Sequence, residues 1–201
     1  MDKKRVIVAD DEGLIAMDVA EMLNEAGYEV VGIAGNGAEA LELGVKLRPD
    51  IFVMDIKMPV MDGLAAAKQI AAKGLGPVVI LTAFAESGLM QEAGESGVYG
   101  YILKPVEEMA LRAGMTIALN RYREQEELKA SKKQAEQELA ARKVVEKAKG
   151  LLMSRYGWSE DTAFAKLRDL AMKKGWKMEK VAAKVIDEIE SKEKIKMSKK
   201  S

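Results

Sequence analysis

The chain of 201 residues contains neither cysteine nor histidine. Without cysteine there are no disulfide bonds, thiolate metal ligands or cysteine nucleophiles, and without histidine there is no imidazole catalysis or histidine-bound zinc. Long hydrophobic runs are also missing, whereas a helix that spans a bilayer needs about 20 consecutive apolar residues. Charged residues follow Met1 directly, so the start of the chain does not resemble a signal peptide. We therefore expect a cytoplasmic protein that does not enter membranes.

Charge is divided unevenly along a chain whose net charge is zero. Residues 142–201 hold 17 basic and 9 acidic residues, a net charge of +8, so residues 1–141 carry −8. The length suits two small domains, because one domain usually takes about 100–200 residues. The split therefore predicts an acidic domain joined to a basic one that meets a polyanion.

Short β-branched runs alternate with amphipathic helical patterns in the first half of the chain. The expected strands cover residues 5–9, 30–34, 51–55, 78–81 and 98–103. The expected helices cover residues 14–26, 38–47, 64–73 and 86–95. Strands that alternate with helices at short spacing are typical of parallel βαβ units. The pattern therefore predicts an α/β fold with a doubly wound, five-stranded parallel sheet.

Polar residues stand where four of the expected strands end. The set is Asp10, Asp11, Asp55, Thr82 and Lys104. The carboxyl ends of parallel strands share one edge of a sheet, and ligands bind there, so these side chains should meet. A hard cation such as Mg²⁺ relieves the repulsion between carboxylates, and a lysine ammonium suits phosphoryl oxygens. The edge predicts phosphoryl transfer onto Asp55, giving an aspartyl-phosphate; taken alone, Asp55 would equally fit a loop or helix cap.

Residues 1–120 resemble the receiver domain of two-component response regulators. The resemblance is carried by Asp10-Asp11, by Asp55 in the loop Asp-Ile-Lys-Met-Pro-Val-Met-Asp-Gly, by Thr82-Ala83 and by Lys104-Pro105. It implies a flavodoxin-like domain in which Asp55 accepts phosphate from a histidine of a partner sensor kinase. It also implies that Asp11, Asp55 and the backbone carbonyl of Lys57 hold Mg²⁺, with Asp10 assisting through water.

The same resemblance assigns roles to residues of the last two strands. Lys104 would pair with the phosphoryl group, and its bond to Pro105 is expected to be cis. Thr82 and Tyr101 match the switch pair of the family, in which the hydroxyl moves toward the phosphate and the ring turns inward. The alternative for Tyr101 is a half-buried strand residue without a switching role.

A long helix is expected from residue 107 to residue 142, because Gly114 is its only glycine and proline is absent. Residues 121–141 would form an exposed linker. A loose 3-4 spacing of apolar residues runs along the helix. Its members are Leu111, Ala118, Leu128, Ala135 and Leu139. The spacing indicates either a marginal coiled-coil dimer or a solvated helix.

Three short helical patterns follow in residues 142–192, with Trp158 and Phe164 as expected core aromatics and Ser159 as an expected N-cap. Residues 193–201 are expected to form a disordered basic tail. The run Val145-Glu146-Lys147-Ala148-Lys149-Gly150-Leu151-Leu152-Met153 and the apolar positions after it are similar to the ANTAR family. These are small three-helix RNA-binding domains of transcription antitermination regulators. The resemblance implies binding to RNA hairpins in leader transcripts. We also expect phosphorylation of Asp55 to favour a homodimer, through the receiver domain or the long helix.

Basic residues with two small residues among them form the expected RNA surface. They are Arg142, Lys147, Ala148, Lys149, Gly150, Arg155, Arg168 and Lys173. Lys180 and Lys184 are instead expected to be solvated charges. Two other outputs remain open: a helix-turn-helix that binds duplex DNA, and a protein-interaction module. An enzymatic output is not expected, because no second catalytic set follows the linker.

Overall fold

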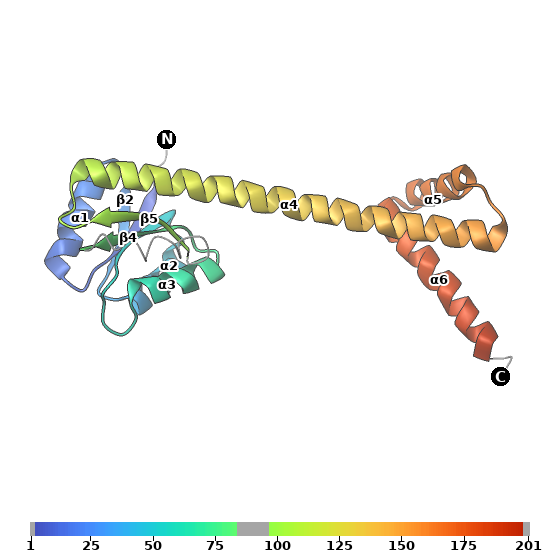
Figure 1. Ribbon diagram of the computed structural model, residues 1–201, viewed down its shortest axis with the longest axis horizontal. Coiled ribbons are helices and arrows are strands. Elements are labelled where there is room, and N and C mark those ends of the chain that lie inside the picture. The colour runs from blue at the N-terminus through green and yellow to red at the C-terminus, as the bar shows by residue number, and fades with distance from the viewer. Residues whose placement is uncertain (1–2, 84–96, 199–201) are drawn as a thin grey trace. The chain divides into compact units, whose positions relative to one another are not determined.

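The computed structural model describes residues 3–83 and 97–198, with side-chain surroundings described up to residue 191. The chain divides into two compact units, Met1–Glu127 and Leu128–Ser201. In the first unit, the strands are β1 (Arg5–Ala9), β2 (Glu29–Ala34), β3 (Ile51–Asp55), β4 (Val78–Thr82) and β5 (Val98–Leu103). The helices of the two units together are α1 (Gly13–Glu25), α2 (Gly37–Leu47), α3 (Gly63–Ala72), α4 (Glu108–Tyr156), α5 (Glu160–Lys174) and α6 (Met178–Ser198) (Figure 1). The helix expected over 86–95 lies outside the described residues.

The five strands form one parallel sheet in the order β2-β1-β3-β4-β5. This confirms the predicted fold class. The chain first adds β2 on one side of β1 and then returns to add β3 on the other side, so the strand order reverses between β1 and β3. Ligands of open α/β sheets bind at such a reversal, outside the carboxyl ends of the strands. The topology thus places the ends of β1 and β3 side by side at a favoured binding edge.

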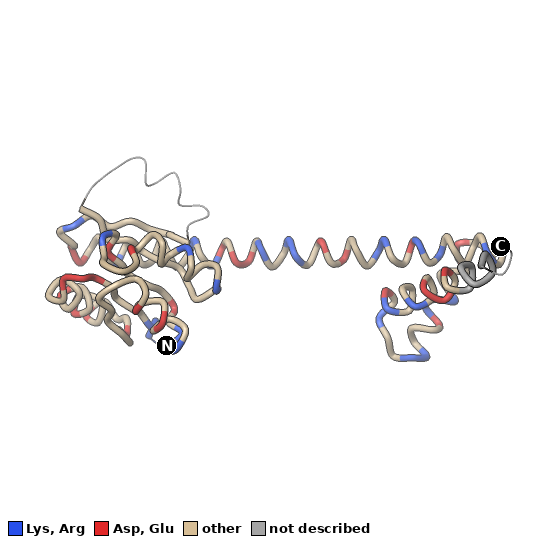
Figure 2. The backbone as a smooth tube through the Cα atoms, turned by 90° about the horizontal axis from the view of Figure 1, so that it is seen from below, with Lys and Arg blue, Asp and Glu red and all other residues tan. Residues whose placement is uncertain are grey.

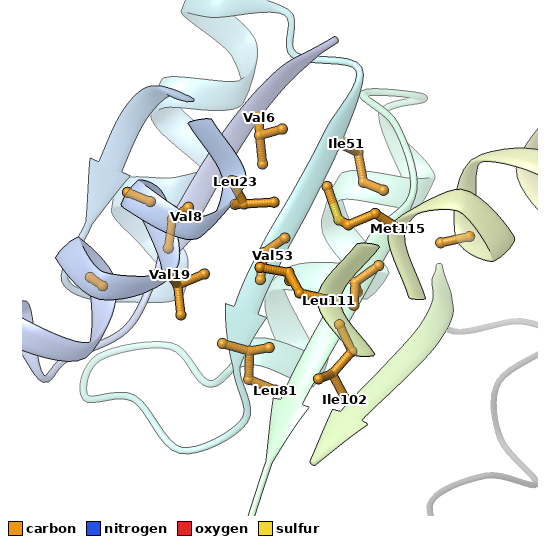
Figure 3. Close-up of a cluster of buried hydrophobic side chains, with 14 residues drawn as sticks. Val6, Val8, Val19, Leu23, Ile51, Val53, Leu81, Ile102, Leu111 and Met115 are labelled. Carbon is orange, nitrogen blue, oxygen red and sulfur yellow. The ribbon is translucent and has the colours of Figure 1, made fainter. Parts of the chain in front are cut away.

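Alternate strand residues point to opposite faces of the sheet, and each face has its own core. On one face, Val8 and Val53 pack with α1 and with the first turns of α4, which contribute Leu111 and Met115 (Figure 3). On the other face, β1 and its neighbours pack against α2 and α3, with Phe52 completely buried. Burial on both faces explains why the strands read as continuous apolar runs in the sequence.

Helix α4 is longer than expected and has no break near residue 142. It runs from Glu108 to Tyr156 and ends before Gly157, whose φ of 69° is left-handed. The predicted linker and the first predicted helix of the C-terminal part are therefore one continuous helix. Leu111 and Ala118 are fully buried in the core of the first unit, so the expectation that they belong to a dimer seam is wrong. Leu128 and Leu139 are exposed.

The second unit is built from the last turns of α4 together with α5 and α6. Its core contains fully buried Ala148, Leu167 and Ala182. Ser159 caps α5, because its side-chain oxygen accepts a hydrogen bond from the backbone N–H of Thr162. This confirms the three helical patterns and the cap. Helix α6 continues to Ser198, so the expectation that a disordered tail begins at residue 193 is wrong for residues 193–198.

One of the two expected core aromatics of this unit is not a core residue. Trp158 is half-buried and packs against the core, but 40% of Phe164 is exposed. The core placement of Phe164 is therefore wrong. The buried face of α5 is formed instead by Ala163, Leu167 and Ala171.

Candidate functional site

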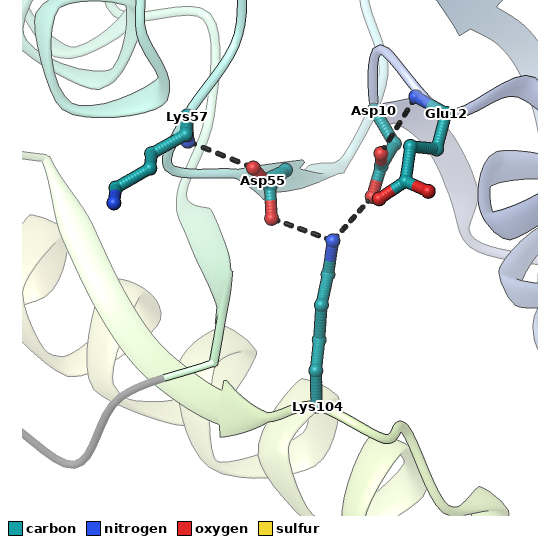
Figure 4. A network of polar contacts seen from close by, with 5 residues as sticks. All are labelled: Asp10, Glu12, Asp55, Lys57 and Lys104. Carbon is teal, nitrogen blue, oxygen red and sulfur yellow. Dashed lines mark hydrogen bonds and ion pairs between the residues drawn. The ribbon is translucent and has the colours of Figure 1, made fainter.

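Three charged side chains meet at the carboxyl edge of the sheet. Asp10 follows β1, Asp55 ends β3, and Lys104 follows β5. The Lys104 Nζ lies 2.8 Å from Oδ2 of Asp10 and 2.6 Å from Oδ1 of Asp55 (Figure 4). Asp10 is 2% exposed and Asp55 is 9% exposed. The sheet thus joins residues from three separate parts of the sequence in one nearly buried ion-pair network.

Backbone hydrogen bonds fix the second oxygen of each carboxylate. The backbone N–H of Glu12 donates to Oδ1 of Asp10 at 3.0 Å. The backbone N–H of Lys57 donates to Oδ2 of Asp55 at 2.7 Å. Each carboxylate therefore has one oxygen on the backbone and one on Lys104, so both are oriented before any ligand arrives.

The loop from β3 to α3 is held close to Asp55 by tight turns. The N–H of Gly63 donates to the carbonyl of Ile56 at 2.9 Å, and the N–H of Met61 donates to the carbonyl of Pro59 at 2.6 Å. The second bond closes a three-residue turn around Val60, whose φ is 66°. A β-branched residue rarely adopts this conformation, which indicates that the surrounding loop imposes it.

Lys104 holds its proton more firmly than an ordinary lysine. Burial of the ammonium acts against the charged form, but hydrogen bonds to Asp10 and Asp55 and the charges of both carboxylates raise the pKa of Lys104. The group is therefore a permanent cation at neutral pH. It compensates one of the two negative charges of the pair and leaves a net charge of −1.

The chemistry of this edge fits a hard divalent cation. The available donors are carboxylate and backbone carbonyl oxygens, which are the ligands that Mg²⁺ takes, usually with only one or two carboxylates and several waters. Asp11 is exposed beside the buried pair. Among the residues that the structure describes, no three acidic side chains converge into a closed metal cage. The donor set thus suits a partly hydrated Mg²⁺ and not a fully enclosed ion.

The remaining expected residues of the edge lie on β4 and β5. Thr82 is buried at the end of β4, and its carbonyl accepts a hydrogen bond of 2.8 Å from the N–H of Lys104. Tyr101 is half-buried in β5. The peptide bond between Lys104 and Pro105 is cis, which confirms that prediction. Their roles as a switch remain a prediction.

The basic residues predicted for the second unit fall into two groups. Lys147 pairs with Glu190 at 2.7 Å. Lys149 is only 7% exposed and pairs with Glu160 at 2.6 Å and with Glu146 at 2.9 Å. Hydrogen bonds to these two glutamates raise the pKa of Lys149. The charges of both lysines are therefore compensated within the protein.

The other predicted residues of this surface differ in how far they are exposed. Ala148 is completely buried, so the expectation that it lies at the surface among the lysines is wrong. Gly150 is exposed, and a Cβ added to it would meet no atom within 4 Å. The exposed cations are Arg142, Arg168 and Lys173. Sequence patterns missed Glu160, the partner of Lys149, because nothing in a local pattern signals a contact between a helix and the cap region of the next helix.

A cavity of about 340 Å³ opens beside this surface. Arg155, Lys166 and Lys173 line it together with Tyr156 and Trp158. The two aromatic rings are stacked, with centroids 4.9 Å apart. Half-buried Trp158 therefore contributes to the core and to the wall of this cavity.

The described helices include no candidate for a membrane span. None of them combines the length and the apolar character that crossing a bilayer requires.

Comparison with known proteins identifies both units. Residues 6–116 match the response regulator receiver domain, and residues 133–186 match the ANTAR domain. The transcriptional regulatory protein PdtaR of Mycobacterium tuberculosis is 42% identical over 184 residues, which cover 92% of this chain and 90% of PdtaR.

Solved structures resemble the first unit. The receiver domain of the putative response regulator NarL from Mycobacterium tuberculosis has a TM-score of 0.56 at 30% identity, and covers 60% of this chain and 98% of that one. The chemotaxis response regulator CheY4 of Vibrio cholerae has a TM-score of 0.54 at 30% identity, and covers 58% of this chain and 99% of that one. The chain therefore belongs to the response regulators, as a receiver domain followed by an ANTAR domain.

Proposed function

We propose that this response regulator is a phosphorylation-controlled RNA-binding protein. Asp55 accepts a phosphoryl group from a histidine of a partner sensor kinase, and the ANTAR domain binds hairpins in leader RNA. Binding that stabilises such hairpins at the expense of a terminator lets the polymerase read on. The observation that carries the proposal is the position of Lys104 Nζ between the nearly buried carboxylates of Asp10 and Asp55.

Residues of this edge supply the nucleophile of the phosphoryl transfer and the groups that orient and stabilise it. A carboxylate oxygen of Asp55 attacks the phosphorus atom, a P–O bond forms, and the P–N bond breaks with its electron pair left on the imidazole nitrogen. The Lys57 N–H keeps the carboxylate oriented during the attack. The Lys104 ammonium stands where the negative charge of the phosphoryl oxygens develops, so it stabilises the transition state and then the aspartyl-phosphate.

A bound Mg²⁺ would add charge neutralisation on the same oxygens. Asp10, Asp11, Asp55 and the backbone carbonyl of Lys57 would hold it. With Lys104 in place, Asp10 and Asp55 keep a net charge of −1, and Asp11 brings it to −2. A divalent cation held by these residues would balance that charge.

The signal would leave the site through β4 and β5. When Lys104 pairs with the phosphoryl group, its backbone bond to Thr82 couples any shift of this segment to the end of β4. Thr82 would move its hydroxyl toward the phosphate, and Tyr101 would turn inward. We propose that this change favours a homodimer. Two ANTAR domains in one dimer would hold two RNA hairpins, with the second binding event helped by a high effective concentration.

On the second unit, the proposed RNA surface centres on the exposed cations Arg142, Arg168 and Lys173, with Arg155 at the adjoining cavity. Lys147 and Lys149 contribute less, because their charges are already paired. Binding of RNA phosphates by Lys147 or Lys149 would compete with the glutamates that already pair with them.

The test measures binding of the full chain to a hairpin-bearing leader RNA, with and without beryllofluoride as a phosphate mimic on Asp55 and with Mg²⁺ present. The Asp55→Ala variant is the control. We expect affinity to rise with the mimic in the wild type only, and to fall with added salt. Equal affinity in both states would remove the switch but keep RNA binding. Binding to duplex DNA in place of every structured RNA would overturn the RNA output.

The dimer step has its own measurement. Sedimentation velocity of the full chain with and without beryllofluoride should show a mimic-dependent shift from monomer to dimer. A monomer that binds two hairpins would contradict the proposed coupling. A dimer whose dissociation constant is the same with and without beryllofluoride would contradict it too.

A further inference from the structure

Three lysines of the ANTAR domain surround one tryptophan. The Nζ of Lys180 lies 4.5 Å from the centroid of a Trp176 ring, that of Lys174 lies 5.4 Å from it, and that of Lys184 lies 5.9 Å from it. Lys174 ends α5, whereas Lys180 and Lys184 lie one turn apart on α6. The turn between the two helices thus gathers cations from both on one aromatic side chain.

Trp176 is held in place by the end of α5. Gly175 adopts a left-handed φ of 63°, and the N–H of Trp176 donates to the carbonyl of Ala171 at 3.0 Å. The indole is half-buried and packs against the core of the second unit. One part of the ring is therefore anchored, and the other part is presented to solvent among the lysines.

The cluster carries a local excess of positive charge. Residues 173–184 contain five lysines and one acidic residue, Glu179. Within the described part of the chain, no ion pair involves Lys174, Lys180 or Lys184, in contrast to Lys147 and Lys149. Like charges one helical turn apart repel each other, and a single indole offsets only part of that repulsion. The arrangement is one that an anion would stabilise.

We propose that Trp176 is a stacking platform for an unpaired nucleotide of the bound RNA, with Lys174, Lys180 and Lys184 on the flanking phosphates; this inference rests on the proposed RNA-binding function. An unpaired nucleotide supplies a flat base that can stack on the indole, and its flanking phosphates can pair with the ammonium groups. Sites for single-stranded nucleic acid combine a cationic surface with aromatic side chains in this way. An anionic membrane fits less well, because its headgroups supply phosphates but no flat base to stack on the indole.

Trp158 and Trp176 are the two tryptophans of the chain, which allows a direct test. In a full-length Trp158→Phe variant, the fluorescence of Trp176 is read alone while a synthetic RNA stem-loop with an unpaired purine loop is added. Binding is followed independently by the anisotropy of a label on the RNA. We expect quenching of Trp176 with the same midpoint as the anisotropy change. A matched stem-loop with abasic loop nucleotides should bind more weakly and leave Trp176 unquenched.

Substitutions give the second readout. Trp176→Leu should weaken binding about 5- to 100-fold, the range expected for loss of one stacked base. Lys180→Gln with Lys184→Gln should lower the slope of log affinity against log salt by about 1.4, since each contact to single-stranded phosphate contributes about 0.7. Lys132→Gln with Lys133→Gln, at exposed positions of α4, is the matched control and should leave the slope unchanged.

The outcomes separate this inference from the function on which it rests. RNA binding that leaves Trp176 fluorescence unchanged overturns the platform and keeps the RNA-binding function. No binding of any stem-loop RNA overturns both. Quenching by vesicles of anionic lipid but not by RNA would assign the cluster to membranes and overturn the inference. If Trp176→Leu fails to fold, the fluorescence titration with Trp176 intact still decides.

Discussion

Gly63 lies directly against the backbone carbonyl of Asp55, so close that a Cβ on residue 63 would overlap the carbonyl oxygen. The contact brings the start of α3 onto the end of β3. It fixes the loop that presents the acceptor carboxylate, and it leaves no space for any side chain at position 63.

The first prediction concerns this contact. Gly63→Ala should lower the free energy of unfolding by about 1–3 kcal/mol, as for other overpacked sites. It should also slow phosphoryl uptake, because the backbone at Asp55 must move. Gly13→Ala is the matched control, since a Cβ there meets no atom within 4 Å. Chemical denaturation and phosphorylation from acetyl phosphate measure the two effects. Equal stability of both variants would show that the loop yields without strain.

A second prediction concerns Lys104. Lys104→Gln leaves Asp10 and Asp55 without their shared cation, so the melting temperature without Mg²⁺ should fall, by the equivalent of about 3 kcal/mol for a broken buried pair. Added Mg²⁺ should raise the melting temperature of this variant more than that of the wild type, because the cation replaces the lost charge. Lys73→Gln, at an exposed lysine after α3, should respond to Mg²⁺ as the wild type does. An equal Mg²⁺ response in all three proteins would argue against a shared site.

A third prediction contrasts two cations of the ANTAR domain. Arg168→Gln should reduce RNA affinity and lower the salt slope by about 0.7–0.9, the value for one phosphate contact. Lys149→Gln should leave the salt slope unchanged, because Glu160 and Glu146 already compensate this ammonium. It should instead lower the melting temperature, since it removes an ion pair between α4 and α5. A larger loss of RNA affinity for Lys149→Gln than for Arg168→Gln would refute this ranking.

The fourth prediction is a pH dependence at Asp50. Burial opposes ionisation of this carboxyl, but hydrogen bonds from the Lys4 ammonium and from the Arg5 backbone lower its pKa. Because the folded-state pKa lies below the unfolded value of about 3.9, the stabilisation is complete above that value and is lost as the pH falls through the folded pKa. The difference in unfolding free energy between the wild type and Asp50→Asn should thus be constant above pH ~5 and shrink below pH ~4.

The expected size of this effect is small. The side chain of Lys4 is 51% exposed, so solvent screening limits its ion pair to less than about 1 kcal/mol. Lys4→Gln should remove part of the pH dependence and leave the part due to the Arg5 backbone. A difference that grows toward low pH would contradict the direction of the shift.

A fifth prediction concerns Val60, which is 88% exposed and adopts a φ of 66°. Val60→Gly should raise the free energy of unfolding by about 1 kcal/mol, because glycine tolerates this conformation and little packing is lost. Val45→Gly removes a valine that is 49% exposed from α2, where φ is helical, and should be destabilising. If both substitutions destabilise equally, the turn is not strained in solution.

Sequence patterns were sufficient for the receiver fold and its acidic edge, because both depend on periodicity and topology. A buried parallel strand such as β3 reads as an apolar run, and chain connectivity alone brings Asp10, Asp55 and Lys104 to one edge. The cis bond before Pro105 came from family resemblance. None of these required knowledge of which helix face meets which neighbour.

The ANTAR domain was harder to predict because its surface depends on how the helices pack. The sequence pattern predicts a buried Phe164 and an exposed Ala148, and the structure shows the reverse. The pattern is ambiguous because several faces of these helices carry apolar residues. The charge of Lys149 could not be judged without knowing that Glu160 reaches it. Charges of both signs alternate along α4 (Figure 2), so sequence alone could not show where its tertiary packing ends.

Helix α4 has a further consequence, for local opening of the backbone. Residues 126–140 are all exposed, so packing of a hydrophobic core does not protect their amides from solvent. A free helix of this length is marginal in water because nucleation is costly. Here both ends are already helical and packed, and the segment needs only propagation. Its amides should therefore exchange with solvent faster than those of Leu111 or Leu152, and the first proteolytic cut should fall between the two domains without unfolding either.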